Sequence, residues 1–245
     1  MNPIVVIPAR MASTRLPGKP LADIAGVPMI VRVWRQAVAA GAGPVLVAAG
    51  EAEIAQAVRA AGGEAVLTDA DLPSGSDRIH AALRSFDREA RYDVVVNLQG
   101  DLPAIGPAAI RASIEAMTRL GADIGTLAAP TTAPEDRINP NVTKAVVAWN
   151  ADGLYGRALY FTRAAAPSGD GPLFHHVGIY AYAREALARF VALPPSALER
   201  REKLEQLRAL EAGMTIGVAR VDEVPLCVDT PDDLERARRI LAADS

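Results

Sequence analysis

The sequence predicts an α/β fold with a mostly parallel central sheet. Up to about residue 130, short apolar runs alternate with stretches of helical periodicity, the pattern of consecutive βαβ units. Residues 94–96 are three valines without polar alternation, which indicates a strand buried on both faces. Half of the 245 residues are hydrophobic, enough for the core of one sizeable α/β domain.

The first half of the chain gives strands and helices in strict alternation. The helix predicted over 28–40 has apolar side chains on one face and stops at Gly41. The other predicted strands are 4–7, 45–48, 65–67, 94–98 and 124–128, and the other helices are 51–61, 76–86 and 107–120.

The pattern becomes richer in strands after Pro130. A hairpin is predicted from 144–149 and 158–162 around Asp152-Gly153, followed by a strand at 176–182. Helices at 185–191 and 197–211, a strand at 216–219 and a helix from Pro231 complete the chain. We interpret the Pro- and Gly-rich stretch 164–172 as a mobile loop. We therefore expect a single domain over 1–245, with a β-rich segment at about 130–183 inside it.

Composition excludes several classes of protein. A net charge of −3 and a pI near 5.7 argue against nucleic-acid binding by bulk charge. The single cysteine, Cys227, cannot form an intrachain disulfide and fits a reducing compartment. The sequence shows neither a signal-peptide pattern nor an apolar run of membrane-spanning length, so we expect a cytoplasmic protein without membrane contact.

The stretch IPARMASTRLPGKP, residues 7–20, gathers cations after the first strand. It holds Arg10, Arg15 and Lys19, and lysine is scarce in this chain, with only three in total. Ligands of open α/β sheets bind outside the carboxyl ends of the strands, so these cations and Ser13 suit a polyphosphate. The stretch matches neither a P-loop nor a dinucleotide fingerprint, and a solvated basic loop is the alternative.

Two aspartates are candidate metal ligands. Asp101 follows the strand at 94–98 in NLQGDLP, where a carboxylate beside polyphosphate suggests Mg²⁺ and a simple Gly-Asp turn is the alternative. In VDTPDDLE, Thr230 is the expected N-cap, Pro231 the first helical residue and Asp233 the partner in a capping box. That leaves Asp229 free to be a second ligand.

Three further stretches are ambiguous between structural and binding roles. In PSGSDRI, Ser74 or Ser76 is either a helix cap or part of an anion site. In HHVGIYAY, alternation places His176 and Tyr180 on a polar face that suits a hydroxylated ligand or simply solvent. The stripe of Glu199, Glu202 and Gln206 resembles a solvated helix face, and Cys227 is expected to pack among apolar neighbours.

Taken together, the motifs resemble those of the 3-deoxy-manno-octulosonate cytidylyltransferases, the CMP-Kdo synthetases. The matching stretches are IPARMASTRLPGKPL, SGSDR, NLQGD, NPNVTKAV, ALYFTRA, HVGIYAY, LEQLRALEAG and VDTPDDLERAR. They span nearly the whole chain in the family's order.

The resemblance implies a Rossmann-like nucleotidyltransferase fold and transfer of CMP from CTP to the sugar acid Kdo, for lipopolysaccharide biosynthesis. It implies Mg²⁺ and a homodimer joined through the β-rich segment, which also binds the sugar. Arg10, Arg15, Lys19 and Asp101 would be the catalytic residues. By resemblance, Arg10, Ser13, Arg15 and Lys19 hold the triphosphate, Ser76, Arg78 and Gln99 the nucleotide, Asp101 and Asp229 the metal, and Arg163, His176, Tyr180, Glu202 and Gln206 the sugar.

Two positions depart from the family pattern. Leu102 stands where many relatives have Glu, and Ala49-Gly50 where many have an acidic residue. The sequence leaves three alternatives open: a cytidylyltransferase for 8-amino-Kdo, one for sialic acid, or a catalytically silent nucleotide-binding protein. It identifies no general base and does not choose between one metal ion and two.

Overall fold

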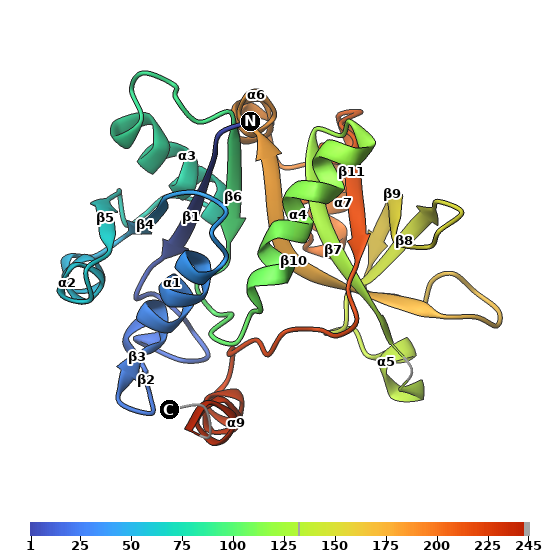
Figure 1. Cartoon of the computed structure of the whole chain (residues 1–245). Coiled ribbons are helices and arrows are strands. Elements are labelled where there is room, and N and C mark those ends of the chain that lie inside the picture. Colours follow the sequence, from blue (N-terminus) through green and yellow to red (C-terminus); the bar gives the residue numbers. More distant parts are fainter. Residues whose placement is uncertain (132, 243–245) are drawn as a thin grey trace. The chain divides into compact units, whose positions relative to one another are not determined.

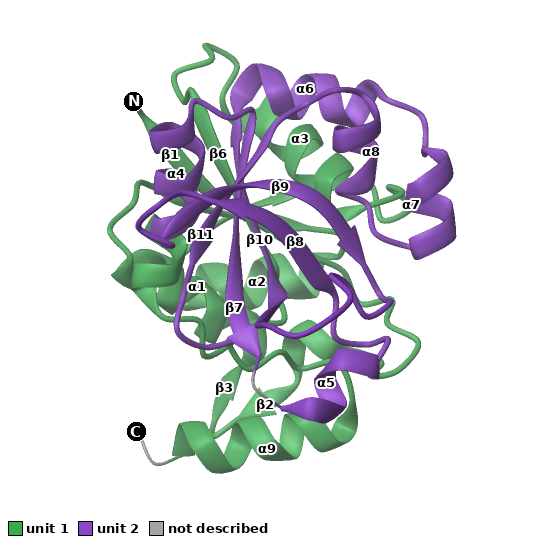
Figure 2. Ribbon diagram, turned by 90° about the vertical axis from the view of Figure 1, so that its right-hand side faces the viewer, with its two compact units in different colours: residues 1–111, 225–245 green, residues 112–224 purple. Residues whose placement is uncertain are grey.

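The computed structural model of the chain describes residues 1–131 and 133–242 (Figure 1). The chain forms two compact units, and Figure 2 shows them in different colours. Unit 1 comprises residues 1–111 and 225–245, and unit 2 comprises residues 112–224. The β-rich segment expected at about 130–183 lies within unit 2. No helix in the described ranges is long and apolar enough to span a bilayer.

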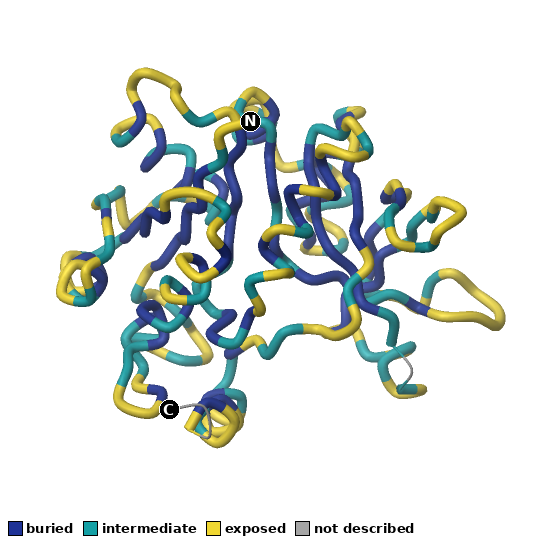
Figure 3. The backbone as a smooth tube through the Cα atoms, viewed as in Figure 1, coloured by how far each residue is buried: buried dark blue, intermediate teal, exposed yellow. Residues whose placement is uncertain are grey.

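Unit 1 is built on a four-stranded parallel sheet. The strands are β1 (Pro3–Ala9), β4 (Val45–Ala49), β5 (Glu64–Leu67) and β6 (Val94–Leu98), in the order β5-β4-β1-β6. Every residue of β6 is buried, as its uninterrupted apolar sequence predicts. Figure 3 shows the central strands as buried and much of the helix surface as exposed.

Helices and one short hairpin complete unit 1. The helices are α1 (Met29–Ala39), α2 (Ala52–Ala60), α3 (Gly75–Phe86) and α9 (Pro231–Ala242), with a 3-10 turn, η1 (Lys19–Leu21), and the hairpin β2 (Asp23–Ile24) and β3 (Val27–Pro28). Helix α4 (Pro107–Leu120) begins in unit 1 and ends in unit 2.

A small apolar cluster attaches the C-terminal segment to the N-terminal hairpin. Val228 and Leu234 pack with Ile24 and Met29, and all four are buried. The N–H of Val228 also donates to the carbonyl of Asp101 at 2.9 Å. The segment around Val228 is therefore fixed beside the loop that follows β6.

Unit 2 has a mixed sheet. Its strands are β7 (Ile124–Thr131), β8 (Lys144–Trp149), β9 (Tyr155–Thr162), β10 (Leu173–Ala183) and β11 (Ile216–Arg220), in the order β10-β7-β11-β9-β8. Among the described strands of this unit, β7 and β11 alone pair in parallel, and β10 also pairs with β8 where His175 faces Lys144. The helices are α5 (Pro134–Ile138), α6 (Arg184–Ala192), α7 (Ala197–Glu202) and α8 (Leu207–Glu211).

Two glycines let helix α4 lie directly on this sheet. A Cβ at Gly125 of β7 would be 2.1 Å from the carbonyl oxygen of Ser113, and one at Gly217 of β11 would be 2.3 Å from that of Ala116. Any side chain at these positions would displace the helix backbone, so glycine is required by close approach.

The single helix predicted over 197–211 is wrong, because the structure has two helices there. Lys203 ends α7 in the left-handed conformation, with φ at 56°. Helix α8 then begins at Leu207. A left-handed lysine leaves no signal in hydrophobic periodicity, so the pattern runs on across the break. The two-residue strands β2 and β3, and the short helix α5, were also not predicted, since such elements are too short for a period to emerge.

Candidate active site

A cavity of about 690 Å³ opens in unit 1 beside the ends of β1 and β6. Open α/β sheets bind ligands at the carboxyl ends of their strands, and this is where the cavity lies. The sequence-predicted residues that line it are Arg10, Ser13, Arg15, Lys19, Ser74, Arg78, Gln99, Asp101 and Asp229.

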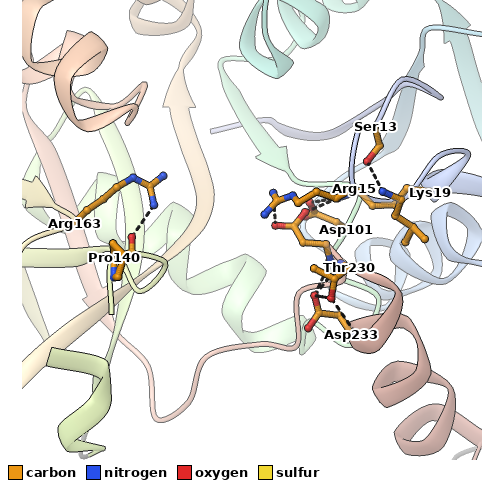
Figure 4. A network of polar contacts seen from close by, with 10 residues as sticks. Ser13, Arg15, Lys19, Asp101, Pro140, Arg163, Thr230 and Asp233 are labelled. Atoms are coloured by element: carbon orange, nitrogen blue, oxygen red, sulfur yellow. Dashed lines mark hydrogen bonds and ion pairs between the residues drawn. The ribbon is translucent and has the colours of Figure 1, made fainter. Parts of the chain in front are cut away.

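Lys19 is the centre of a charge network in this cavity. Its Nζ is 2.8 Å from Asp101 Oδ2 and 2.8 Å from Asp229 Oδ1, and Arg15 Nη2 is 3.1 Å from Asp229 Oδ2 (Figure 4). Burial alone lowers the pKa of the Lys19 ammonium, but Asp101 and Asp229 outweigh it and raise the pKa above its ordinary value. Lys19 is therefore a fixed cation between two carboxylates.

The loop that carries these cations is folded by its own sequence. Gly18 has a φ of 70°, which allows the chain to turn into η1, and its N–H donates to the carbonyl of Met11 at 3.3 Å. Ser13 Oγ accepts the N–H of Leu16 at 3.3 Å. Glu51 Oε2 accepts the N–H of Met11 at 2.8 Å. Glu51, which none of the sequence motifs includes, thus anchors the start of the loop.

Asp229 is positioned by the start of α9. Thr230 Oγ1 accepts the N–H of Asp233 at 3.2 Å, and Asp233 Oδ2 accepts the N–H of Thr230 at 2.9 Å (Figure 4). The predicted capping box is thus confirmed. Its hydrogen bonds leave the Asp229 carboxylate outside the cap, where it pairs with Lys19 and Arg15.

Arg78 lines the cavity, but its guanidinium hydrogen-bonds to the protein itself. Its guanidinium donates to Thr68 Oγ1 at 2.6 Å and to the carbonyls of Asp69 and Ala70 at 2.9 and 3.0 Å. Burial, followed by the nearby charge of Arg10, lowers the pKa of Arg78. Arg78 therefore holds the loop before α3 in place.

The two serines of PSGSDRI have different positions. Ser74 is the N-cap of α3 and accepts the N–H of Asp77 at 3.2 Å. Ser76 is buried within the helix and is not among the residues that line the cavity. Gln99 lines the cavity, and its Nε2 donates to Asn97 Oδ1 at 3.0 Å.

The two departures from the family pattern have local explanations. Leu102 is 5% exposed and packs in the core. At Gly50, a Cβ would be 3.0 Å from Arg78 Nη1 and 3.3 Å from Arg10 Cβ, so a side chain there would crowd both arginines. This chain therefore uses these positions for packing.

The two carboxylates beside Lys19 suit a hard divalent cation, which takes oxygen ligands. Ligand atoms of Asp101, Cys227 and Asp229 lie within 4.8 Å of one another, and the Lys19 ammonium already takes a cation position between the carboxylates. The expectation that Cys227 packs among apolar neighbours is wrong, since the residue is exposed and its sulfur lies beside the two aspartates. Although the residue is exposed, its sulfur is shielded from water, and this burial raises the pKa of the thiol. The negative charges of Asp101 and Asp229 raise it further.

In unit 2, Arg163 and Glu202 are brought together. Glu202 accepts from Thr162 Oγ1 at 2.7 Å and from the N–H of Arg163 at 2.9 Å. Arg163 donates through Nε to the carbonyl of Glu202 at 2.8 Å. Its Nη1 donates to the carbonyl of Pro140, also at 2.8 Å (Figure 4). Burial raises the pKa of Glu202, but these hydrogen bonds outweigh it and hold the pKa below its usual value.

His176 and Tyr180 also lie together in unit 2, 5.5 Å apart between ring centroids. Nε2 of His176 is 3.0 Å from Thr126 Oγ1. Burial, with a smaller effect of His175, lowers the pKa of His176 to about 3, and burial raises the pKa of Tyr180. Gln206 is buried, and its Nε2 has no hydrogen-bond partner among the described residues.

Sequence reasoning missed one buried cation in this unit. Lys144 is fully buried in β8, and its Nζ donates to the carbonyls of Asn139 at 2.7 Å and Arg163 at 3.2 Å. Burial lowers its pKa. The available signal was a lysine at the start of an otherwise apolar strand in a chain with only three lysines.

Two solved structures resemble the fold of this chain. A solved structure of CMP:2-keto-3-deoxy-manno-octonic acid synthetase complexed with CTP has a TM-score of 0.91 and 37% identity, covering 100% of both chains. A nucleotidyl transferase from Methanothermobacter has a TM-score of 0.65 at 18% identity, a likeness of fold alone. The predicted fold class is thereby confirmed as an α/β nucleotidyltransferase fold.

Proteins similar in sequence identify the family within the nucleotidyltransferase fold. A 3-deoxy-manno-octulosonate cytidylyltransferase of Parvibaculum lavamentivorans is 68% identical over 244 residues, 100% of this chain and 94% of that protein. One of Rhodospirillum centenum is 64% identical over 240 residues, 98% and 93% of the two chains. The family model described as Cytidylyltransferase matches residues 4–216. The chain belongs to the cytidylyltransferase family.

Proposed function

We propose that the protein transfers CMP from CTP to the anomeric hydroxyl of Kdo, giving CMP-Kdo and pyrophosphate. The observation that carries the proposal is the pairing of Lys19 with Asp101 and Asp229 inside the unit 1 cavity. A nucleotidyl transfer needs cations for the triphosphate and carboxylates for a metal ion, and these are the groups present. The names of the sequence relatives support the choice of sugar acid.

The reaction requires that the two substrates are positioned and that the charge on the departing pyrophosphate is neutralised. The sugar hydroxyl attacks the α-phosphorus, its proton is released, and the bond to pyrophosphate breaks on the opposite side. Arg10, Arg15 and Lys19 line the cavity and would neutralise the charge on the departing pyrophosphate. Gln99, with Ser13, would bind the nucleotide through polar contacts. Arg78, predicted for the same role, contributes by ordering the loop before α3, whereas Ser76, also predicted for it, is buried within α3.

Asp101 and Asp229 are the proposed Mg²⁺ ligands. When bound, the metal supplies Lewis-acid stabilisation of phosphate oxygens and of the attacking hydroxyl. The Lys19 ammonium must then leave the carboxylates, and a triphosphate offers it new partners. Arg163, His176, Tyr180, Glu202 and Gln206 of unit 2 are the proposed sugar-acid residues, with the orphan Gln206 Nε2 as an available donor. A homodimer and a cytoplasmic location remain predictions.

The first experiment measures pyrophosphate release from CTP and Mg²⁺ with Kdo, 8-amino-Kdo or sialic acid. Release that depends on Kdo supports the proposal, and release with another acid alone overturns the sugar assignment. Absence of release with every acid, despite CTP binding, supports a silent nucleotide-binding protein.

The variant Asp101→Asn tests the metal assignment. We expect turnover to fall by about 10²–10³-fold, because one charged metal ligand is lost, while CTP affinity stays within a few-fold. Asp232→Asn on α9 is the control, since Asp232 is exposed and does not line the cavity. Equal losses of turnover and CTP affinity would contradict a role for Asp101 in metal binding.

A further inference from the structure

Strand β10 has an irregularity next to two proposed sugar residues. Its pairing with β7 runs regularly to Val177 opposite Leu127 and resumes at Ala181 opposite Gly125. Residues 178–180 of β10 therefore lie opposite a single residue of β7, Thr126. Carbonyls within such a bulge lose their regular ladder partners, so they need others.

Thr126 supplies the missing partner. Its side chain is fully buried, and its Oγ1 is 2.8 Å from the carbonyl oxygen of Ile179 and 3.3 Å from that of Val177. Nε2 of His176 is the third neighbour, at 3.0 Å. One hydroxyl thus meets two carbonyl oxygens and one imidazole nitrogen.

Counting protons decides the tautomer of His176. A threonine hydroxyl has one hydrogen to donate, and carbonyl oxygens can only accept. The hydrogen goes to the carbonyl of Ile179, the nearer of the two, because Ile179 lies inside the bulge, has no partner residue in the ladder with β7, and would lose its donor at a cost. Oγ1 then meets Nε2 as an acceptor, so Nε2 must carry the imidazole proton.

The other ring nitrogen remains available. No described residue hydrogen-bonds to Nδ1 of His176. The ring is held by Phe161 at 4.8 Å and Tyr180 at 5.5 Å between centroids, so it has a fixed orientation. A neutral imidazole protonated at Nε2 presents a lone pair at Nδ1.

We propose that Thr126 is a positioning residue that fixes His176 as the neutral Nε2–H tautomer, so that Nδ1 accepts a hydrogen bond from a hydroxyl of the sugar acid. The substrate part of this inference rests on the proposed function. Burial, which lowers the pKa of His176 to about 3, is consistent with a ring that stays neutral. His176 then acts as a hydrogen-bond acceptor for the sugar.

The tautomer is tested by nitrogen NMR of the full chain labelled with ¹⁵N-histidine. The chain has three histidines, so the spectrum is simple, and the spectrum of His176→Gln assigns the resonances of His176 by their loss. We expect a protonated, pyrrole-type Nε2 and an unprotonated, pyridine-type Nδ1 at neutral pH. A proton on Nδ1, or an imidazolium, would overturn the proposal. This measurement uses the wild-type chain and needs no variant at Thr126.

Kinetics test the consequence for the substrate. Thr126→Val keeps the shape but removes the acceptor, so we expect the KM for Kdo to rise by roughly tenfold, the value of one hydrogen bond, with little change in the KM for CTP. Thr126→Ser keeps the hydroxyl and should restore both the tautomer and the KM. Thr143→Val is the control, because it changes another buried threonine, one that meets His176 only through its backbone carbonyl.

The outcomes separate this inference from the proposed function. Equal increases in the KM for both substrates, or unchanged kinetics in Thr126→Val, would refute the positioning role. If no sugar acid is a substrate for the wild type, the proposed function and the substrate part fail together. The NMR spectrum of the wild type would still decide which tautomer His176 adopts, and the spectrum of Thr126→Val would decide whether Thr126 sets it.

Discussion

The polar groups of the two units are stabilised in different ways. In unit 1, Lys19, Asp101, Asp229 and Arg15 neutralise one another through ion pairs that remain partly open to solvent. In unit 2, Arg163 and Lys144 are held largely by backbone carbonyls, and His176 by a buried hydroxyl. The first arrangement can exchange partners when a charged ligand arrives, whereas the second fixes side chains before any ligand binds.

The largest expected effect concerns His176 in unit 2 and is measured as the change in the free energy of unfolding with pH. The folded pKa of His176 is about 3, below the ordinary value of 6.5. Between these values the unfolded chain binds a proton that the folded chain does not, so stability falls as pH falls. The full effect is on the order of 5 kcal/mol.

We expect His176→Gln to lack this loss, because glutamine does not titrate and its amide can still donate to Thr126. Urea unfolding of wild type and variant at pH 7 and pH 4 measures the difference. The same pH dependence in both proteins would show that His176 is not buried as a neutral ring.

The exchangeable arrangement is tested by Lys19→Met. The ammonium and a metal ion cannot occupy the same position between Asp101 and Asp229, so the variant should bind Mn²⁺ without CTP more tightly than wild type does. Turnover should fall about 10²-fold, because a cation near the leaving group is lost. Electron paramagnetic resonance of free Mn²⁺ and pyrophosphate release provide the two measurements.

Lys203→Met is the control for Lys19→Met, since it removes an exposed lysine charge in unit 2. If Mn²⁺ affinity is the same in wild type and Lys19→Met, the ammonium does not occupy the metal position.

The smallest expected effect is the difference in stability between breaking a buried ion pair and breaking an exposed one. Glu199 accepts from Arg208 at 2.6 and 2.8 Å, and both side chains are almost buried. Glu199→Gln leaves the arginine charge poorly compensated and should lower the free energy of unfolding by about 2 kcal/mol. Glu235→Gln, in an exposed pair with Arg238, should cost less than about 0.5 kcal/mol. Equal effects in urea unfolding would mean that burial does not distinguish the pairs.

The elements that depend on a local sequence pattern could be predicted from the sequence. The bounds predicted for β6, α4 and β8 agree with the structure, because apolar runs and capping residues mark them clearly. The capping box at Thr230 was predictable for the same reason, and it isolated Asp229 correctly from the helix cap. The proximity of Asp101 and Asp229 followed only from matching motifs, since they are far apart in the chain.

Features that depend on tertiary contacts could not be predicted. The stripe of Glu199, Glu202 and Gln206 looked solvated, yet Glu199 caps α7 and pairs with Arg208, while Glu202 binds Thr162 and Arg163. The bulge in β10 is also invisible in a strand that alternates normally by sequence. The partners of Glu202 and of the bulge lie far away along the chain, and Arg208 lies beyond the break at Lys203, so the periodicity of one element contains no information about them.

The glycines beneath α4 have a consequence for the evolution of this fold. At Gly125 and Gly217 a single methyl group would meet main-chain atoms, which cannot rotate away, whereas a Cβ at Gly178 would meet nothing within 4 Å. No single substitution at Gly125 or Gly217 is therefore neutral, and any other residue at these positions requires helix α4 to move first. At Gly178, on the strand with the proposed sugar residues, a Cβ has open space, so a substitution there does not require the scaffold to move.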